Sequence, residues 1–205
     1  MVIGISGKIR AGKSKVAKDL SEILRKRGKQ VEQKSFAFPI YKILSEMYET
    51  SIDKIKDEKQ AKVPIYINTR TTESGFVMSD FRKLLQLIGN GLREYGDSNV
   101  WVDVLFGCNN TKIISDLTGN ADVVWVIEDL RYPNEAQRIR DLNGMLIRVE
   151  RNEHQPNSHV AENSLDDWTD WDVIIDNNFN KDEYEVRLRK LLEDQDYERF
   201  FRQSN

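Results

Sequence analysis

The first part of the chain shows two apolar patterns separated by a glycine-rich segment. Val2 to Ser6 is a short apolar run, and its length favours a buried parallel strand over a helix. From Ser14 to Arg27, apolar residues recur at helical spacing between lysines and arginines, and Gly28 follows as a stop signal. The pattern predicts a strand, a glycine turn and a helix, in that order.

The rest of the chain continues to alternate between short apolar runs and amphipathic segments. Further strands are expected at Gln30 to Phe36, Val123 to Ile127, Met145 to Val149 and Val173 to Ile175. Helices are expected at Ile40 to Tyr48, Ser79 to Glu94, Val100 to Phe106, Pro133 to Leu142 and Lys181 to Phe200, with Ser79 or Asp80 as an N-cap. Residues 49–78 show no clear period, and a mobile loop or small insertion is expected there. The alternation predicts an α/β fold with a parallel sheet of about five strands flanked by helices.

Composition narrows the class of protein. The 205 residues fit one domain, 1–205, and the single cysteine, Cys108, excludes an internal disulfide and a four-cysteine zinc module. No apolar run is long enough to span a bilayer and no signal core is present, so a cytoplasmic protein without a membrane partner is expected. The formal net charge of -3 lacks the basic excess that is typical of proteins that bind a nucleic-acid polymer. Any anionic ligand must therefore be met by locally placed cations.

One segment carries a specific chemical motif. Gly7 to Ser14 reads GKIRAGKS and matches G-x-x-x-x-G-K-[ST] in full, between the first predicted strand and the first predicted helix. The glycines let backbone N–H groups close around a phosphate, and the helix N-terminus adds its positive dipole end. Lys13 would reach the β and γ phosphates, and the Ser14 hydroxyl would ligate magnesium. The alternative is a glycine-rich turn with solvated lysines.

A second candidate is the acid that follows the apolar run at Val123. Glu128 and Asp129 come directly after it. In a phosphate-loop protein, a carboxylate at a strand's carboxyl end can hold magnesium, directly or through water. Helix capping by Asp129 is the alternative, because aspartate is common where a strand turns into a helix.

Several cations could offset the charge of two phosphorylated ligands, and for each the alternative is a solvated surface position. They are Lys8, Arg10, Arg82, Arg93, Arg131, Arg148 and Arg151.

Other chemistries have weaker signals. His159 and Glu162 stand at helical spacing but lack a third ligand, so zinc is not expected. No G-x-S-x-G pattern supports a serine hydrolase. Trp168 and Trp171 are expected to be packing groups, with base stacking as the alternative.

In combination, the motifs resemble those of the phage-type deoxynucleoside monophosphate kinases, within the nucleoside-monophosphate-kinase-like P-loop proteins. Only the first motif is specific alone, and the resemblance depends on the order of segments over most of the chain. These segments are Gly7 to Ser14, Ser35 to Pro39, Arg82 to Gly89 with Trp101-Val102, Asp129 to Ala136, Ile147 to Arg151, Ser158 to Glu162, and Asp176-Asn177.

The resemblance implies transfer of the γ-phosphoryl group of ATP to a deoxynucleoside 5′-monophosphate, with magnesium. It implies a P-loop NTPase fold with a monophosphate-binding region at about 40–110 and a lid at about 150–166. The implied phosphate-loop residues are Gly7, Lys8, Arg10, Ala11, Gly12, Lys13 and Ser14, with Asp176 and Asn177 near the donor adenine. The implied catalytic residues are Lys13, Asp129, Arg131 and Arg151, the magnesium residues Ser14 and Asp129, and the acceptor residues Arg82, Gln86 and Arg93.

One departure leaves the acceptor open. Family members often carry an aspartate in an S-F-A-D-P segment where this chain has Phe38. Kinases of phosphomevalonate or dephospho-coenzyme A remain an alternative, as does a P-loop ATPase or switch without a small acceptor. The expected partners are small-molecule nucleotides, and whether the chain forms a homodimer stays open.

Overall fold

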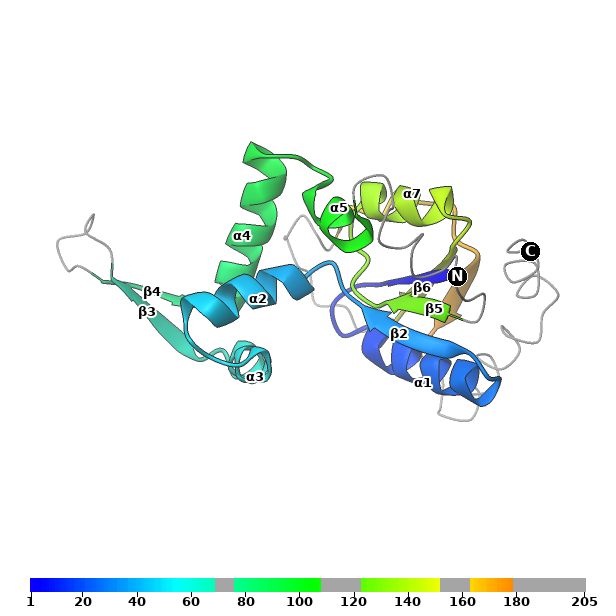
Figure 1. Ribbon diagram of the computed structural model, residues 1–205, viewed down its shortest axis with the longest axis horizontal. Helices are drawn as coiled ribbons and strands as arrows, with labels where there is room; N and C mark the ends of the chain where they lie inside the picture. Colours follow the sequence, from blue (N-terminus) through cyan, green and yellow to red (C-terminus); the bar gives the residue numbers. More distant parts are fainter. Residues whose placement is uncertain (69–75, 108–122, 152–162, 179–205) are drawn as a thin grey trace. The chain divides into compact units, whose positions relative to one another are not determined.

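The computed structural model describes residues 1–68, 76–107, 123–151 and 163–178 (Figure 1). The chain divides into two compact units. The first consists of Met1–Phe36 and Val102–Asn205, and the second of Ala37–Trp101. The second unit is therefore inserted between two parts of the first.

A five-stranded parallel sheet forms the centre of the first unit. Its strands are β1 (Val2–Ser6), β2 (Gln30–Lys34), β5 (Val123–Ile127), β6 (Met145–Glu150) and β7 (Val173–Asp176). They lie in the order β2-β5-β1-β6-β7, and every neighbouring pair is parallel. All five carboxyl ends therefore meet at one edge, where open α/β sheets bind ligands. The predicted α/β fold is confirmed.

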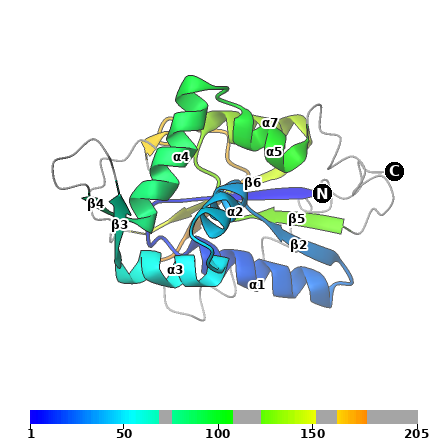
Figure 2. The ribbon, with the colours of Figure 1, turned by 60° about the vertical axis from the view of Figure 1, so that its left-hand side comes forward.

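Helices cover both faces of this sheet. α1 (Lys13–Lys26) packs on one face, and α7 (Pro133–Asp141) with the second half of α5 (Val100–Phe106) packs on the other (Figure 2). Side chains of β5 alternate between the two cores: Val124 and Val126 face the α1 side, and Trp125 faces the α7 side. Burial on both faces explains why β1 and β5 read as continuous apolar runs, whereas β2 at the sheet edge is polar and partly exposed.

The second unit combines three helices with a hairpin. The helices are α2 (Phe38–Met47), α3 (Ile52–Ala61) and α4 (Phe81–Tyr95), and β3 (Pro64–Asn68) pairs antiparallel with β4 (Phe76–Asp80). Among the described side chains, its core cluster contains Tyr41, Leu44, Ile55, Phe81 and Leu84.

Of the two alternatives for residues 49–78, the loop is wrong, because the segment contains α3, β3 and the start of β4 within the inserted unit. α3 buries only Ile55, so its sequence carries almost no apolar period. Its ends are marked by caps instead: the Ser51 hydroxyl accepts a hydrogen bond from the Lys54 amide at 3.2 Å. Lys62 ends the helix in the left-handed region, with φ 54.

The other helices of the described residues start and end close to the predicted positions. Asp80 is the N-cap of α4, since its carboxylate accepts from the Lys83 amide at 2.9 Å. The predicted C-terminal helix and the His159–Glu162 pair lie outside the described residues. Within the described part of the chain, no helix combines the length and apolarity needed to cross a bilayer.

Candidate functional site

The loop between β1 and α1 has a backbone that requires its two glycines. Gly7 has φ 155 and Gly12 has φ 100, both unfavourable for a side chain. A Cβ at Gly7 would overlap the Val149 carbonyl oxygen, and one at Gly12 would overlap the Asn177 amide. Gly12 is also the N-cap residue of α1 and contributes no capping side chain to the first-turn amides. This helix end therefore has the geometry and dipole of an anion site.

The motif lysine lies against its own loop. Lys13 Nζ donates to the carbonyl oxygens of Gly7 at 2.7 Å and Lys8 at 2.9 Å. Ser14, the next residue of α1, is exposed. Phosphate oxygens placed at the loop could replace these carbonyls as acceptors, so the ammonium is close to where the motif requires it.

The end of β7 supports the loop from a distant part of the sequence. Asn177 Nδ2 donates to the Ala11 carbonyl at 2.8 Å, and the Asn177 amide donates to the Glu150 carbonyl at 2.7 Å. Asp176 instead closes a local turn, because its Oδ1 accepts from the Asn178 amide at 3.0 Å. Asn177 is thus held against the loop backbone, and an adenine contact for either residue stays a prediction.

Asp129 connects the carboxyl ends of two strands. Its Oδ2 accepts from the Ser35 hydroxyl at 2.7 Å and its Oδ1 from the Phe36 amide at 3.0 Å, so it fixes the segment that follows β2. The acid that serves the start of α7 is Glu135: its Oε2 accepts from the amides of Arg131 at 2.8 Å and Tyr132 at 3.1 Å. Glu135 is 1% exposed. Sequence reasoning missed this role, although an acid at the third helical position is a known signal.

The structure places the remaining first-unit candidates as follows. Arg131 follows β5 and Arg151 follows β6, and both are half-buried. Both therefore lie at the sheet edge that carries the loop. Arg10 is exposed and has φ 64.

Lys8 makes a contact that the sequence does not indicate. Its Nζ donates to Asn163 Oδ1 at 2.9 Å and to the two carboxylate oxygens of Asp166 at 2.5 and 2.6 Å. Asp166 also lies 3.5 Å from Arg148 NH2. No motif connects these positions, because 158 residues separate Lys8 from Asp166.

The three acceptor candidates occur in the second unit, on α4. Spacings of four and seven residues place Arg82, Gln86 and Arg93 on one helix face, and all three are half-buried. Arg93 NH1 donates to the Gly89 carbonyl at 3.1 Å, and Trp101 Nε1 donates to the same oxygen at 2.9 Å. The opposite face of α4 packs in the core of this unit.

Phe38 replaces the aspartate that the resemblance leads one to expect. It is the first residue of α2 and 45% exposed. Lys42 Nζ lies 5.1 Å from the centroid of its ring. A cation that an aspartate could pair with is thus held over an aromatic face.

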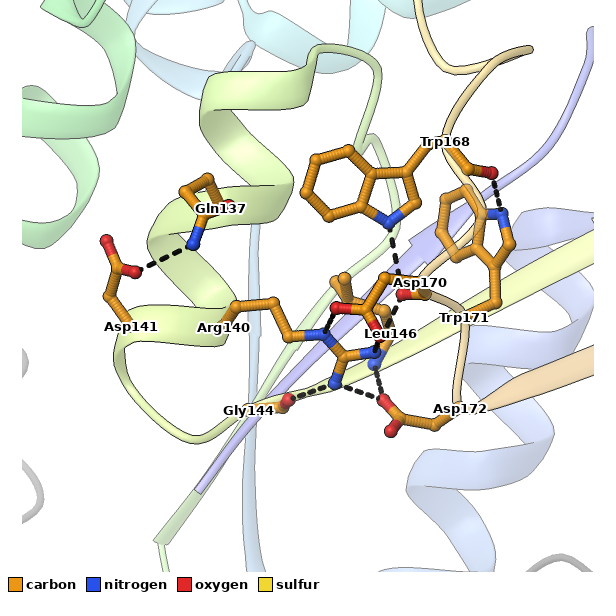
Figure 3. Close-up of polar contacts among 9 residues, drawn as sticks. All are labelled: Gln137, Arg140, Asp141, Gly144, Leu146, Trp168, Asp170, Trp171 and Asp172. Atoms are coloured by element: carbon orange, nitrogen blue, oxygen red, sulfur yellow. Dashed lines mark hydrogen bonds and ion pairs between the residues drawn. The ribbon is translucent and has the colours of Figure 1, made fainter.

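The two tryptophans near β7 are packing groups, as expected. Trp168 and Trp171 pack against the core on the α7 side of the sheet. Trp171 Nε1 donates to the Trp168 carbonyl at 2.7 Å, and Trp168 Nε1 to the Asp170 carbonyl at 3.0 Å (Figure 3). Arg140 of α7 binds Asp172 at 2.6 Å and Asp170 at 2.8 Å, which anchors the segment before β7.

The described residues contain no group of three or more His, Cys, Asp or Glu side chains that could hold a metal ion. Magnesium that binds with phosphates usually takes few ligands from the protein and the others from phosphate and water. Ser14, exposed at the start of α1, and Asp129, at the end of β5, each carry an oxygen of the kind magnesium binds, and their role as magnesium ligands stays a prediction.

The parallel sheet and the Gly7–Ser14 loop define a P-loop α/β protein. The chain is 28% identical over 190 residues to the "Putative deoxynucleotide monophosphate kinase" of Acanthamoeba polyphaga mimivirus, which covers 90% of this chain and 92% of that protein. No protein-family model matches the chain.

Two solved shikimate kinase structures are also similar. The enzyme of Aquifex aeolicus has a TM-score of 0.41 at 16% identity, covering 94% of this chain and 96% of that one. The enzyme of Bacteroides thetaiotaomicron has a TM-score of 0.38 at 12% identity, covering 94% of this chain and 97% of that one.

Proposed function

We propose that this protein is a phosphotransferase that moves the γ-phosphoryl group of ATP to a deoxynucleoside 5′-monophosphate and releases the two diphosphates. The observation that carries the proposal is the Gly7–Ser14 loop, whose glycines leave no room for a Cβ and whose lysine lies at the loop. The mimivirus relative, aligned over 90% of the chain, supports the acceptor class.

Positioning and charge neutralisation supply the rate in such a reaction, because the acceptor is already a phosphate anion and needs no dedicated base. The loop amides and Lys13 hold the β and γ phosphates of the donor and stabilise the charge of the transferring group. Arg131 and Arg151, at the same sheet edge, offset the repulsion between donor and acceptor phosphates. Ser14 and Asp129 would hold magnesium together with the nucleotide, and the bound ion would supply further charge neutralisation.

The acceptor monophosphate is assigned to the polar face of α4. Arg82 and Arg93 provide the cations, and Gln86 between them provides an amide that can donate and accept hydrogen bonds. Arginine suits this task because its planar fork matches phosphate oxygens. Because Phe38 stands in place of an acid, we expect an apolar or aromatic contact with the base to determine acceptor specificity.

The direct test is a coupled ADP-release assay with ATP and magnesium against a panel of acceptors. The panel contains dAMP, dGMP, dTMP, dCMP, 5-substituted dCMP and the ribonucleotides, with phosphomevalonate and dephospho-coenzyme A for the alternative kinases. At least one deoxynucleoside monophosphate is expected to raise ADP release well above the rate without acceptor, and the product is identified as the diphosphate. ATP hydrolysis that no monophosphate accelerates would refute the proposal.

The acceptor face can be tested by one matched pair of variants. Arg82→Ala is expected to raise KM for the monophosphate by about tenfold or more, because a charge-assisted contact to phosphate is lost. KM for ATP should change little. Lys83→Ala is the control, since Lys83 is exposed and follows Arg82 on α4. If both variants shift KM for the acceptor equally, general loss of positive charge explains the effect and the assignment of Arg82 fails.

A further inference from the structure

Asp166 forms an ion pair with the phosphate loop. It lies directly after Leu165, which is 3% exposed in the core, and its amide donates to the Asn163 carbonyl at 3.0 Å. Its carboxylate faces Arg148, whose side chain is only 12% exposed and whose guanidinium carbon lies 5.6 Å from the Trp171 ring. Asp166 thus follows a core residue in the chain, and its carboxylate lies beside a largely buried cation.

Lys8 connects Asp166 with the loop backbone. Its ammonium group donates to both Asp166 carboxylate oxygens and to Asn163 Oδ1. The carbonyl oxygen of the same residue accepts Lys13 Nζ at 2.9 Å and the Ala11 amide at 3.1 Å. A displacement of the Lys8 side chain would thus move the peptide group against which the motif lysine lies.

Arg148 holds the Asp166 carboxylate near the loop. The strand register pairs it with Ser6, the residue immediately before the loop. Arg148 and Lys8 are both cations, and without an acid between them they would repel each other next to the loop. Asp166 removes this repulsion and connects them.

We propose that Asp166 is a positioning residue for the phosphate loop. Through its ion pair with Lys8, it holds the loop backbone and the Lys13 side chain in place. This deepens the proposed function, because it rests on nucleotide binding at the loop. The Asp166 side chain is 45% exposed, and exposed ion pairs contribute little to global stability. The effect of losing Asp166 should therefore appear in loop order and nucleotide affinity, with little change in thermal stability.

The test is a double-mutant cycle on the full chain with Lys8→Met, Asp166→Asn and the combined variant. Lys8→Met keeps most of the alkyl stem, and Asp166→Asn is nearly isosteric. Asp167→Asn is the matched control, because Asp167 is the exposed neighbour of Asp166. The affinity for ADP with magnesium is measured by titration calorimetry without any acceptor, and the melting temperature is recorded for each protein.

Each single variant is expected to lower the affinity for ADP by about tenfold, because a binding group is misplaced. The double variant should bind ADP as well as the single variant with the lower affinity does. Tighter ADP binding by Asp166→Asn would overturn the inference, because Lys8 would then be a phosphate ligand that Asp166 restrains. Multiplying effects in the double variant, or unchanged affinity in both single variants, would overturn it as well.

Amide hydrogen exchange of the unliganded proteins provides a readout that needs no nucleotide. Exchange in a peptide covering residues 7–13 should accelerate in Lys8→Met and Asp166→Asn and stay unchanged in the Asp167→Asn control. Unchanged loop exchange in the two variants would overturn the inference even if the wild type binds no ADP. If the wild type binds ADP but phosphorylates no monophosphate, the proposed function fails while the cycle still decides the role of Asp166.

Discussion

Replacing Lys13 by alanine is expected to lower kcat by at least about 100-fold, the range seen when one charge aimed at a developing anion is removed. Lys13 Nζ lies within hydrogen-bond distance of the Gly7 and Lys8 carbonyls, so its charge is already at the loop before any ligand binds. The measurement is the ADP-release assay with the best acceptor from the panel, with a melting curve to show that the protein remains folded.

Lys15→Ala is the control for this variant. Lys15 is an exposed lysine of α1, two residues beyond Lys13, and pairs with Asp19 at 2.6 Å. Exposed helix pairs of this kind contribute only a few tenths of a kcal/mol, so its removal should leave kcat near the wild-type value. Near-normal turnover of Lys13→Ala would show that the Gly7–Ser14 loop is not the phosphate site.

The centre of the parallel sheet could be predicted because β1 and β5 are buried on both faces. β1 and β5 are buried at every position, so a periodic signal was unnecessary and five-residue apolar runs were enough. α3 shows the opposite case. Its single buried residue, Ile55, gives no period to recognise, and the unit to which it belongs is held together by contacts between segments distant in sequence.

The candidate site also has one part that could be predicted from the sequence and one part that could not. The phosphate loop is contiguous, and its chemistry fixes both the residue types and their spacing, so it could be found from sequence. The contacts of Asp129 with Ser35 and of Asp166 with Lys8 join residues that are 94 and 158 positions apart. Asp129 could be found as a candidate because it follows an apolar run, but nothing local indicates its partner Ser35. Asp166 stands in no such pattern among the 34 acidic residues of the chain, and only its contacts in the folded protein identify it.

Gly12→Ala is expected to weaken nucleotide binding by about 100-fold or more, because a Cβ there forces the loop out of its phosphate-binding shape. The residue has φ 100, and the added carbon would meet the side-chain amide of Asn177. Strain of this kind costs about 1 to 3 kcal/mol, so the free energy of unfolding should fall as well. Calorimetric titration with ADP and urea unfolding measure the two effects.

Gly28→Ala separates backbone strain from steric overlap. Gly28 also has a positive φ, 82, but a Cβ there meets nothing within 4 Å. Its replacement should cost about 1 kcal/mol of stability from the left-handed conformation alone and leave ADP affinity unchanged. Equal losses of affinity in the two glycine variants would contradict a specific role for Gly12.

The overlap at Gly12 is with a side chain, so it can be relieved by a second substitution. Adding Asn177→Ala to Gly12→Ala removes the amide that the Cβ would meet and should recover part of the lost stability. Affinity should recover less, because the Asn177 bond to the Ala11 carbonyl is lost at the same time. At Gly7 the overlapping atom is the backbone oxygen of Val149, which no side-chain truncation removes, so Gly7→Ala should have no comparable rescue.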